Sequence, residues 1–497
     1  MDIDLIDETD FPNYSKSTGK RPAFVPVDDA HPFDLEAYIS TYTGKTVVYR
    51  LIHIISICPT LAPQAFQLAV QHILQGRDPN LYQSLIIAYD TTAKTLPDAE
   101  LPPHTDLAVI DQQWIDETNT KNQAERSKLE VELKTYTSNM IKESIRMAHR
   151  DLGNFYRSVG DYSSSLKHYT KSREFCTSSQ HIVDMCMSVL ELLLEQRNYA
   201  HIATYVFKAD GALENAAARS NAAPNAAQAA TLPPDAQQVA KAKAAAERER
   251  VQTKLDVATA LSHLAQGAYE KAAQSFLKAG PIKNLEEWAT KIVAPGDIAI
   301  YATLSALATF SRSAIKSNLL DNDSFGVYIE QEPYVRELVE AYMGNRFKTV
   351  LELLERYSTR HYIDLYLSTH VNNLVLEIQS RALVLYFQPF ASIKMDRMSQ
   401  AFGWTPEFLE QQVVHLIQKG EIHARVDRQN RILKAKVVDQ RAELFSRAVK
   451  SGADIQSTNR KLLLRMRLQQ SDLIVKPPKN QNQNQNHIDF LAYSVVI

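Results

Sequence analysis

One stretch of the sequence carries the small and aromatic residues that two closely packed antiparallel helices require. The pattern is Leu152-Gly153-x-x-Tyr156, then Gly160-Asp161-Tyr162, then Ser165-x-x-x-Tyr169. Small side chains let one helix approach the other, and the aromatic side chains fill the space between them. A glycine in the middle is typical of a helix C-terminus, so the stretch predicts a helical hairpin.

Similar turns recur further along the chain. They are Arg197-Asn198-Tyr199, Gly267-Ala268-Tyr269 and Gly344-Asn345-Arg346-Phe347. Their aromatic residues follow Tyr162 at steps close to one, two and two periods of the ~34-residue tetratricopeptide repeat. The sequence therefore predicts an all-α solenoid of tetratricopeptide-like hairpins. An irregular bundle of antiparallel helices is the alternative.

The pattern changes after Arg381. We expect a short strand at Ser392-Ile393, helices over 395–402 and 406–419, and a hairpin over 422–435. Thr405-Pro406-Glu407 is typical of a helix start, and Ile422, Ala424 and Val426 alternate with polar residues as in a strand. This order is that of a winged helix. A long helix over about 439–470 follows it.

Three segments lack the pattern of packed elements. The N-terminus is acidic and interrupted by proline, residues 211–250 hold 16 alanines and three prolines, and the C-terminal tail is rich in Asn and Gln. The predicted segments are a mobile arm (1–32), a helical-repeat region (33–208), an Ala-rich disordered insertion (209–250), the helical part of a second domain (251–380), the winged helix (381–437), a C-terminal bundle helix (438–475) and a disordered tail (476–497).

Bulk composition indicates a soluble intracellular protein. The formal net charge is -2 over 497 residues, which provides no overall field for attracting nucleic acid or membrane. Three cysteines, Cys58, Cys176 and Cys186, favour a reducing compartment over a disulfide framework. The N-terminus does not read as a signal peptide, and the longest apolar run, 298–310, is shorter than a membrane span.

No catalytic or cofactor motif stands out. Gly44-Lys45-Thr46 resembles the end of a phosphate-binding loop, but Ile39 occupies the position of the required glycine. We therefore interpret Gly44 as the stop signal of the preceding helix. Close-spaced zinc ligands and the G-x-S-x-G and G-x-G-x-x-G patterns are also missing. We predict no enzymatic activity, no metal and no cofactor, although a catalytic site of scattered residues is the alternative.

A winged helix raises the possibility of nucleic-acid binding. The helix that would read DNA, 406–419, carries Glu407 and Glu410 with Lys419 as its only full positive charge, which is a poor surface for DNA. Residues 425–467 instead hold 12 Lys and Arg against 4 Asp and Glu. This surplus is either a solvated face or a patch for an acidic partner or phosphate. The candidate patch comprises Arg425, Arg428, Arg431, Lys434, Arg460 and Lys461.

Two surfaces look incomplete without other chains. The hairpin offers unpaired backbone groups at a sheet edge, and a long helix with an apolar stripe needs something to cover it. The candidate edge residues are Ile393, Ile422, Ala424, Val426, Ile432 and Leu433. The candidate stripe residues are Leu444, Ala448, Ile455, Leu462 and Met466.

A helical-repeat array that continues into a winged helix resembles the PCI family of scaffold subunits. Local motifs are similar to those of signalosome subunit 1 over about residues 33–208 and 250–478. These motifs include Asp34-Leu35-Glu36-Ala37-Tyr38-Ile39, Cys58-Pro59-Thr60-Leu61, Tyr386-Phe387, Val438-Asp439-Gln440-Arg441 and Lys476-Pro477-Pro478. The last two favour the COP9 signalosome over the paralogous proteasome lid subunit.

The resemblance implies a non-catalytic scaffold. The signalosome removes the ubiquitin-like modifier NEDD8 from cullin-RING ligases with a metalloprotease that another subunit carries. By resemblance, the neighbours of this chain are signalosome subunits 2 and 3, cullin-RING ligases bind through the complex, and the location is cytoplasmic and nuclear. Membrane and nucleic acid are not expected partners. The alternatives are a proteasome lid subunit and a winged-helix nucleic-acid-binding protein.

Overall fold

The computed structural model describes residues 25–95, 101–108, 111–222, 234–436 and 440–473. The chain divides into two compact units, each of which is described by itself. The first runs to Ile422 and includes Arg428–Ile432, and the second holds His423–Asp427 and the residues from Leu433 on. None of the helices in the described ranges is long and apolar enough to cross a membrane.

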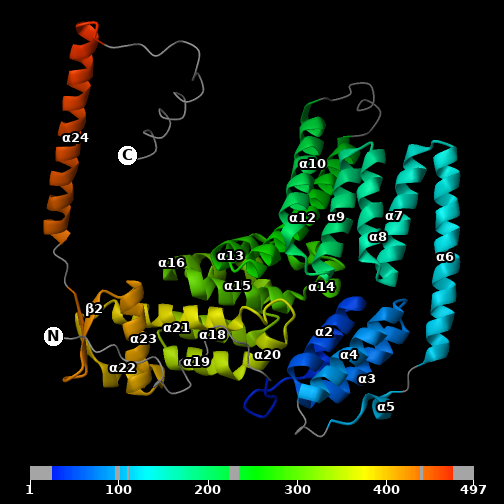
Figure 1. Cartoon of the computed structure of the whole chain (residues 1–497), viewed down its shortest axis with the longest axis horizontal. Coiled ribbons are helices and arrows are strands. Elements are labelled where there is room, and N and C mark those ends of the chain that lie inside the picture. Colours follow the sequence, from blue (N-terminus) through cyan, green and yellow to red (C-terminus); the bar gives the residue numbers. More distant parts are fainter. Residues whose placement is uncertain (1–24, 96–100, 109–110, 223–233, 437–439, 474–497) are drawn as a thin grey trace. The chain divides into compact units, whose positions relative to one another are not determined.

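Helices make up almost all of the first unit (Figure 1). The first helices are α1 (Leu35–Ser40), α2 (Lys45–Ile57), α3 (Ala62–Leu74), α4 (Pro79–Thr95), α5 (His104–Leu107), α6 (Gln112–Ser138), α7 (Lys142–Val159), α8 (Tyr162–Ser172), α9 (Ser179–Glu195) and α10 (Ile202–Ala222). They are followed by α12 (Pro234–Ala265), α13 (Tyr269–Lys278), α14 (Trp288–Lys291), α15 (Pro295–Thr309), α16 (Arg312–Ile315), α17 (Asp323–Ile329), α18 (Pro333–Met343), α19 (Phe347–Arg356), α20 (Ser358–Ile363) and α21 (Val371–Phe387).

The predicted helical hairpin is present as α7 and α8. Gly160 ends α7 in the left-handed conformation, with φ 95°, and Asp161 caps α8 by accepting a hydrogen bond from the backbone N–H of Ser164. A Cβ on Gly153 would lie 2.5 Å from the ring of Tyr169, so only glycine permits this approach of the two helices. The Tyr169 hydroxyl donates to the Asn154 side chain across the same interface. The small and aromatic positions therefore act as the sequence predicts.

The other predicted turns also separate paired helices. α9 packs on α10, α12 on α13, and α18 on α19. Each turn contains one residue with positive φ: Arg197 (56°), Gly267 (74°) and Asn345 (58°). A left-handed residue lets the chain leave one helix and reverse direction within a few residues. The tetratricopeptide-like solenoid is thereby confirmed.

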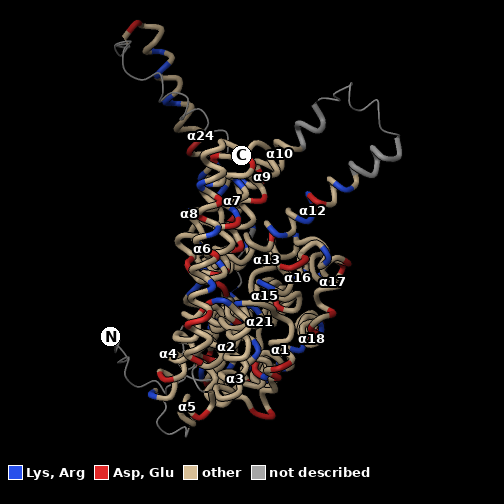
Figure 2. Tube along the Cα trace, turned by 90° about the vertical axis from the view of Figure 1, so that its right-hand side faces the viewer, with Lys and Arg blue, Asp and Glu red and all other residues tan. Residues whose placement is uncertain are grey.

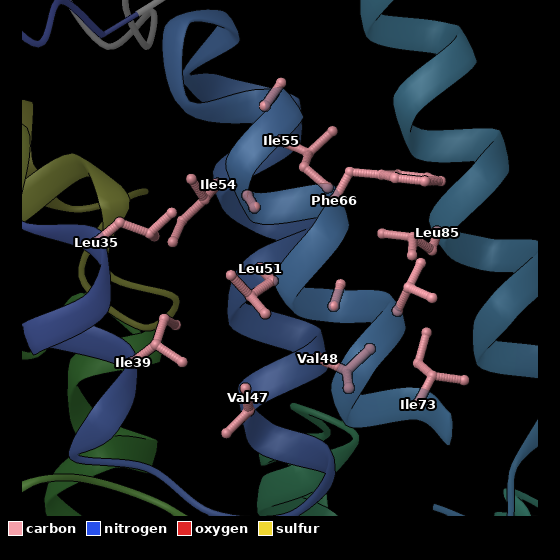
Figure 3. Close-up of a cluster of buried hydrophobic side chains, with 14 of the residues drawn as sticks. Leu35, Ile39, Val47, Val48, Leu51, Ile54, Ile55, Phe66, Ile73 and Leu85 are labelled. Atoms are coloured by element: carbon pink, nitrogen blue, oxygen red, sulfur yellow. The ribbon is translucent and has the colours of Figure 1, made fainter. Parts of the chain in front are cut away.

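The N-terminal helices form their own hydrophobic core. Leu35 and Ile39 of α1, Leu51 of α2, Phe66 of α3 and Leu85 of α4 are all buried, and Figure 3 shows them converging.

Two expectations differ from the structure here. Residues 1–24 of the predicted arm lie outside the described residues, but Val25 is buried and its N–H donates to the carbonyl of Ile57. Gly44 does not end α1, which stops at Ser40, but precedes α2.

We expected the Ala-rich insertion to be disordered or loosely helical and to pass into a charged helix at about Lys241, and its described residues are helical. Its first part belongs to α10, which continues to Ala222, and its last part opens α12 at Pro234. Alanine has the highest helix propensity, and proline is well tolerated in the first turn of a helix. We gave the prolines too much weight, because Pro234 starts a helix instead of breaking one. Residues 223–233 lie outside the described residues.

The winged helix has the predicted order of elements, which are β1 (Ser392–Lys394), α22 (Met395–Phe402), α23 (Pro406–Lys419), β2 (Ala424–Asp427) and β3 (Ile432–Ala435). Thr405 caps α23 as predicted, by accepting a hydrogen bond from the N–H of Phe408. Together the strands form one sheet in the order β1-β3-β2. The second unit ends in the predicted long helix, α24 (Gln440–Gln470).

Candidate partner-binding surfaces

The edge of the sheet differs from the one predicted. We expected Ile432 and Leu433 to lie on an open edge, but their strand, β3, occupies the middle of the sheet. The reason is β1, a strand of three residues that pairs with β3 and so occupies the side of β3 that we took to be open. Next to this pairing, the N–H of Met395 donates to the Arg431 carbonyl at 2.8 Å. Within the described sheet, the hairpin strand left at an edge is β2.

Most of the predicted edge side chains point into the protein. Ile393, Ile422, Ala424 and Leu433 are buried, whereas Val426 and Ile432 are half-buried. These apolar side chains therefore contribute to the core of the winged helix. What β2 offers at its outer side is backbone, which can pair with a strand from another chain irrespective of side chains.

The cations of the candidate basic patch are exposed, and several of them have acidic neighbours. Arg428 pairs with Glu410, Arg431 lies 3.6 Å from Asp396, and Lys434 lies 3.6 Å from Asp427. Arg425, on β2, and Arg460 and Lys461, on α24, are also exposed. These carboxylates partly neutralise the positive field of the three cations. Residues 425–436 nevertheless hold five Lys and Arg against one Asp, and α24 holds seven Lys and Arg against two Asp and Glu, so both segments contribute to the positive surplus (Figure 2).

The apolar stripe of α24 lies in water in the isolated chain. Leu444, Ile455, Leu462 and Met466 are each 55–64% exposed, and Ala448 is exposed as well. Apolar side chains of this size normally contribute about 1.5 to 3 kcal/mol each when they are fully buried. A helix with an uncovered apolar stripe is typical of an element that packs against another chain.

The sequence analysis missed other apolar residues on the same helix. They are 37–72% exposed: Phe445, Val449, Leu463, Leu464 and Leu468. The signal was available, because residues 462–464 are three consecutive leucines between Lys461 and Arg465. We selected positions by a single helical stripe, and that choice excluded leucines on the other faces.

A second feature that we missed is a set of four charged side chains inside the first unit. This buried ion cluster consists of Arg50 on α2, Asp297 on α15, Arg360 on α20, and Asp364 directly after α20. Arg50 donates from Nη2 to Asp297 at 3.2 Å and from Nη1 to Asp364 at 2.8 Å. Arg360 donates to the other oxygen of Asp297. Arg50, Asp297 and Asp364 are buried, whereas Arg360 is half-buried and also lies 3.5 Å from Glu332, so these charges neutralise each other largely away from water.

Tyrosine hydroxyls add hydrogen bonds to the two carboxylates of the buried ion cluster. Tyr301 donates to Asp364 at 2.5 Å, and Tyr42 donates to Asp297. Burial alone would raise the pKa of Asp364, but the two guanidinium groups outweigh burial and hold that pKa below its ordinary value. Asp364 therefore stays ionised. The cluster ties α2 to helices that follow it by about 250 to 310 residues, so it fixes the N-terminal helices to the later ones.

The Gly44-Lys45-Thr46 motif opens onto a cavity of about 550 Å³. The cations on its wall are engaged by carboxylates: Lys45 by Asp78 at 2.7 Å, Arg77 by Glu125, Arg157 by Glu191 and Glu195, and Lys291 by Glu287. A phosphate-binding loop presents free donors to its ligand. Since these donors already have partners, we assign no ligand to the cavity.

Within the described ranges, no group of three or more His, Cys, Asp or Glu could hold a metal ion. Cys58 and Cys186 are buried free thiols, and Cys176 is a half-buried free thiol. Burial raises the pKa of Cys186 to about 11, so this thiol stays protonated at neutral pH.

A pair of histidines makes the α7–α8 hairpin sensitive to acid. His149 Nδ1 lies 3.1 Å from His168 Nδ1, and burial, followed by the repulsion of His168, lowers the pKa of His149 to about 4. In the unfolded chain this pKa is about 6.5. Between these two values the unfolded chain binds a proton that the folded chain does not, so stability present at pH 7 is lost as pH falls toward 4.

We therefore expect the free energy of unfolding to fall by about 2 kcal/mol more in the natural chain than in His149→Gln between pH 7 and pH 4. Urea unfolding at several pH values measures this difference. Burial also lowers the pKa of His361 to about 3. This residue adds the same pH dependence to both proteins, so it does not affect the difference between them. Parallel pH profiles for the two proteins would contradict the assignment of the effect to His149.

Comparisons with known proteins agree with this arrangement. The family model described as 26S proteasome subunit RPN7 matches residues 111–318, and the PCI domain model matches residues 335–436. The COP9 signalosome complex subunit 1b of Drosophila melanogaster is 32% identical over 482 residues, covering 89% of this chain and 86% of the relative. The COP9 signalosome complex subunit 1 of Arabidopsis thaliana is 31% identical, covering 89% of this chain and 91% of the relative.

This chain belongs to the COP9 signalosome subunit 1 family. The match to a proteasome protein is weaker: the 26S proteasome non-ATPase regulatory subunit 6 of Oryza sativa is 22% identical over 38% of this chain and 49% of the relative. In this member of the subunit 1 family, the PCI match runs from α18 to just beyond β3 and includes the whole winged helix. The predicted PCI fold and family are confirmed.

Proposed function

We propose that this chain is a non-catalytic scaffold subunit of the COP9 signalosome, where it supports the removal of NEDD8 from cullin-RING ubiquitin ligases. The exposed apolar stripe of α24 is the observation that carries the proposal. Its side chains from Leu444 to Met466 lie in water in the isolated chain. A soluble protein rarely leaves so much contiguous apolar surface uncovered unless another chain packs on it.

Each of the two surfaces fits a different kind of contact. The β2 edge of the winged helix can extend its sheet with a strand of a neighbouring subunit, and α24 can pack against neighbouring helices. We propose signalosome subunits 2 and 3 as the neighbours. The non-catalytic role rests on family membership, and we propose that cullin-RING ligases bind through the complex, in cytoplasm and nucleus.

Purification of the tagged full-length chain from its own cells tests the proposal. We expect the other signalosome subunits to co-purify in comparable amounts, as identified by mass spectrometry. The variant Leu462→Asp with Met466→Asp is the control, because its charged side chains should release those subunits. Recovery of proteasome lid subunits in their place would overturn the assignment in favour of the paralogous complex.

A further inference from the structure

A further cavity in the first unit has aromatic walls and a carboxylate. Its volume is about 330 Å³, which is at the lower end of the range of ~300 to 1,000 Å³ that ligand pockets occupy. It lies between α1, α20 and the first residues of α15 and α18; α1 and α18 lie together in Figure 2. We call it the tyrosine pocket, and its wall includes Asp34, Tyr38, Glu332, Tyr334, Tyr357 and Arg360.

The tyrosines offer ring carbon to this pocket. The hydroxyl of Tyr38 accepts a hydrogen bond from Arg50, and the hydroxyl of Tyr334 lies 3.0 Å from Nε2 of His361. Arg50 and His361 are both buried, so these hydroxyls are directed toward the interior of the protein. Tyr357 stacks on Tyr334 with the ring centres 4.0 Å apart. The pocket wall is therefore largely aromatic carbon, which packs against apolar groups and attracts cations.

Glu332 is a charged group of the pocket that lacks a close partner. Its side chain is 25% exposed, and the cation beside it, Arg360, lies 3.5 Å away and donates a closer bond to Asp297. Burial raises the pKa of Glu332, and the attraction of Arg360 only partly opposes this change. The carboxylate has thus lost much of its water without full compensation. A cation that entered the pocket would supply the missing interaction.

Arg360 does not make the pocket positive. Its guanidinium lies over the Tyr38 ring, 4.5 Å from the ring centre, and its charge is balanced by Asp297 within the buried ion cluster. Its Nη1 has no hydrogen-bond partner among the described residues but is shielded from solvent, so it does not face a ligand. The charges that remain on the wall belong to Asp34 and Glu332. The pocket therefore favours a cation over an anion.

We propose that the tyrosine pocket binds a lysine or arginine side chain of a partner protein. The aliphatic stem of such a side chain packs on the aromatic wall, and its charged head pairs with Glu332. A free amino acid fits less well, because its carboxylate would need a cation and Arg360, the one Lys or Arg on the described wall, is already engaged. The pocket uses neither β2 nor α24, so this inference goes beyond the proposed function and does not depend on it.

Small blocked amino acids test the pocket on the full-length chain. The cationic probes are Nα-acetyl-lysine methylamide and Nα-acetyl-arginine methylamide. Nα-acetyl-norleucine methylamide is the neutral probe, because it has the same stem as lysine without the ammonium group. Titration followed by saturation-transfer NMR measures binding. We expect dissociation constants of about 1 mM for the cationic probes and at least about ten-fold weaker binding of the neutral probe. Equal binding of the lysine and norleucine probes would overturn a cation site.

Two glutamine variants locate the binding. Glu332→Gln keeps the shape of the side chain and removes its charge, so we expect the dissociation constants of the cationic probes to rise at least about ten-fold. The fold should be retained, because Glu332 makes no side-chain cap of α18, and circular dichroism checks this. Glu337→Gln is the matched control: it removes the same charge from an exposed position on the same helix, with an expected change below about two-fold. Equal binding by the two variants would overturn the assignment to the pocket.

Two further arms distinguish the source of the cation. We expect free L-lysine to bind no better than its blocked form, and ten-fold tighter binding of free L-lysine would assign the pocket to a small metabolite instead. Lys16, Lys20 and Arg21 could compete from within this chain. The full-length variant Lys16→Gln with Lys20→Gln and Arg21→Gln should therefore bind the lysine probe like the natural chain. Ten-fold tighter binding by this variant would show that the chain's own N-terminal segment fills the pocket and would overturn a partner protein.

Discussion

Replacement of Arg50 by methionine should lower the free energy of unfolding by about 3 to 5 kcal/mol. Arg50 is fully buried and donates to both Asp297 and Asp364. Methionine fills a similar space but leaves these carboxylates with one guanidinium between them. Desolvated charges that lose a partner are strongly destabilising. Urea unfolding followed by circular dichroism measures the change.

Two variants make the Arg50 prediction specific. Arg336→Met removes an exposed cation that lies 3.2 Å from Glu340, and its expected cost is below about 1 kcal/mol. Arg50→Met combined with Asp364→Asn also removes one of the buried negative charges, so part of the lost stability should return. If Arg50→Met and Arg336→Met lowered the free energy of unfolding equally, burial would not determine how much the ion cluster contributes to stability.

A single charged residue inside an apolar helix was the available signal for the buried ion cluster. Arg50 is the only Lys, Arg, Asp or Glu from 46 to 57, and Asp297 is the only one from 292 to 310. Such residues are almost never fully buried unless they are paired. The sequence could therefore have indicated that each has a buried partner. It could not indicate which partner, because the pairs join residues between 63 and 314 positions apart.

Local sequence patterns predicted which helices and strands form better than they predicted which elements pack or pair with one another. Turn glycines, caps and apolar spacing act within about one or two helical turns, so the α7–α8 hairpin and the order of the winged helix follow from the sequence. The position of β3 depends on β1, a strand of three residues almost 40 positions earlier. Such a short strand has little pattern of its own, and sheet edges are decided by pairings that local spacing does not encode.

Truncation of the chain after Val438 should remove it from the signalosome while leaving the helical array folded. The cut deletes α24, which carries nine of the large apolar side chains that are exposed among the described residues. We expect at least a 100-fold weaker association with the other subunits, because several apolar side chains lose their contacts together. Co-purification from cells, together with circular dichroism of the truncated chain, measures both effects. Normal co-purification of the truncated chain would contradict the role of α24.

Leu462→Asp with Met466→Asp tests the same surface without removing any residue. Both side chains lie on one face, one turn apart, and both are more than half exposed in the isolated chain. The substitutions should therefore leave the fold of the free protein unchanged. In the complex they would place two charges in an apolar contact away from water, which should weaken assembly at least about 100-fold. Ser457→Asp, an exposed position on the opposite face of the helix, should have a small effect. If size exclusion shows the double variant in the complex at natural levels, the stripe is not an interface, and the loss after truncation must come from another property of the helix.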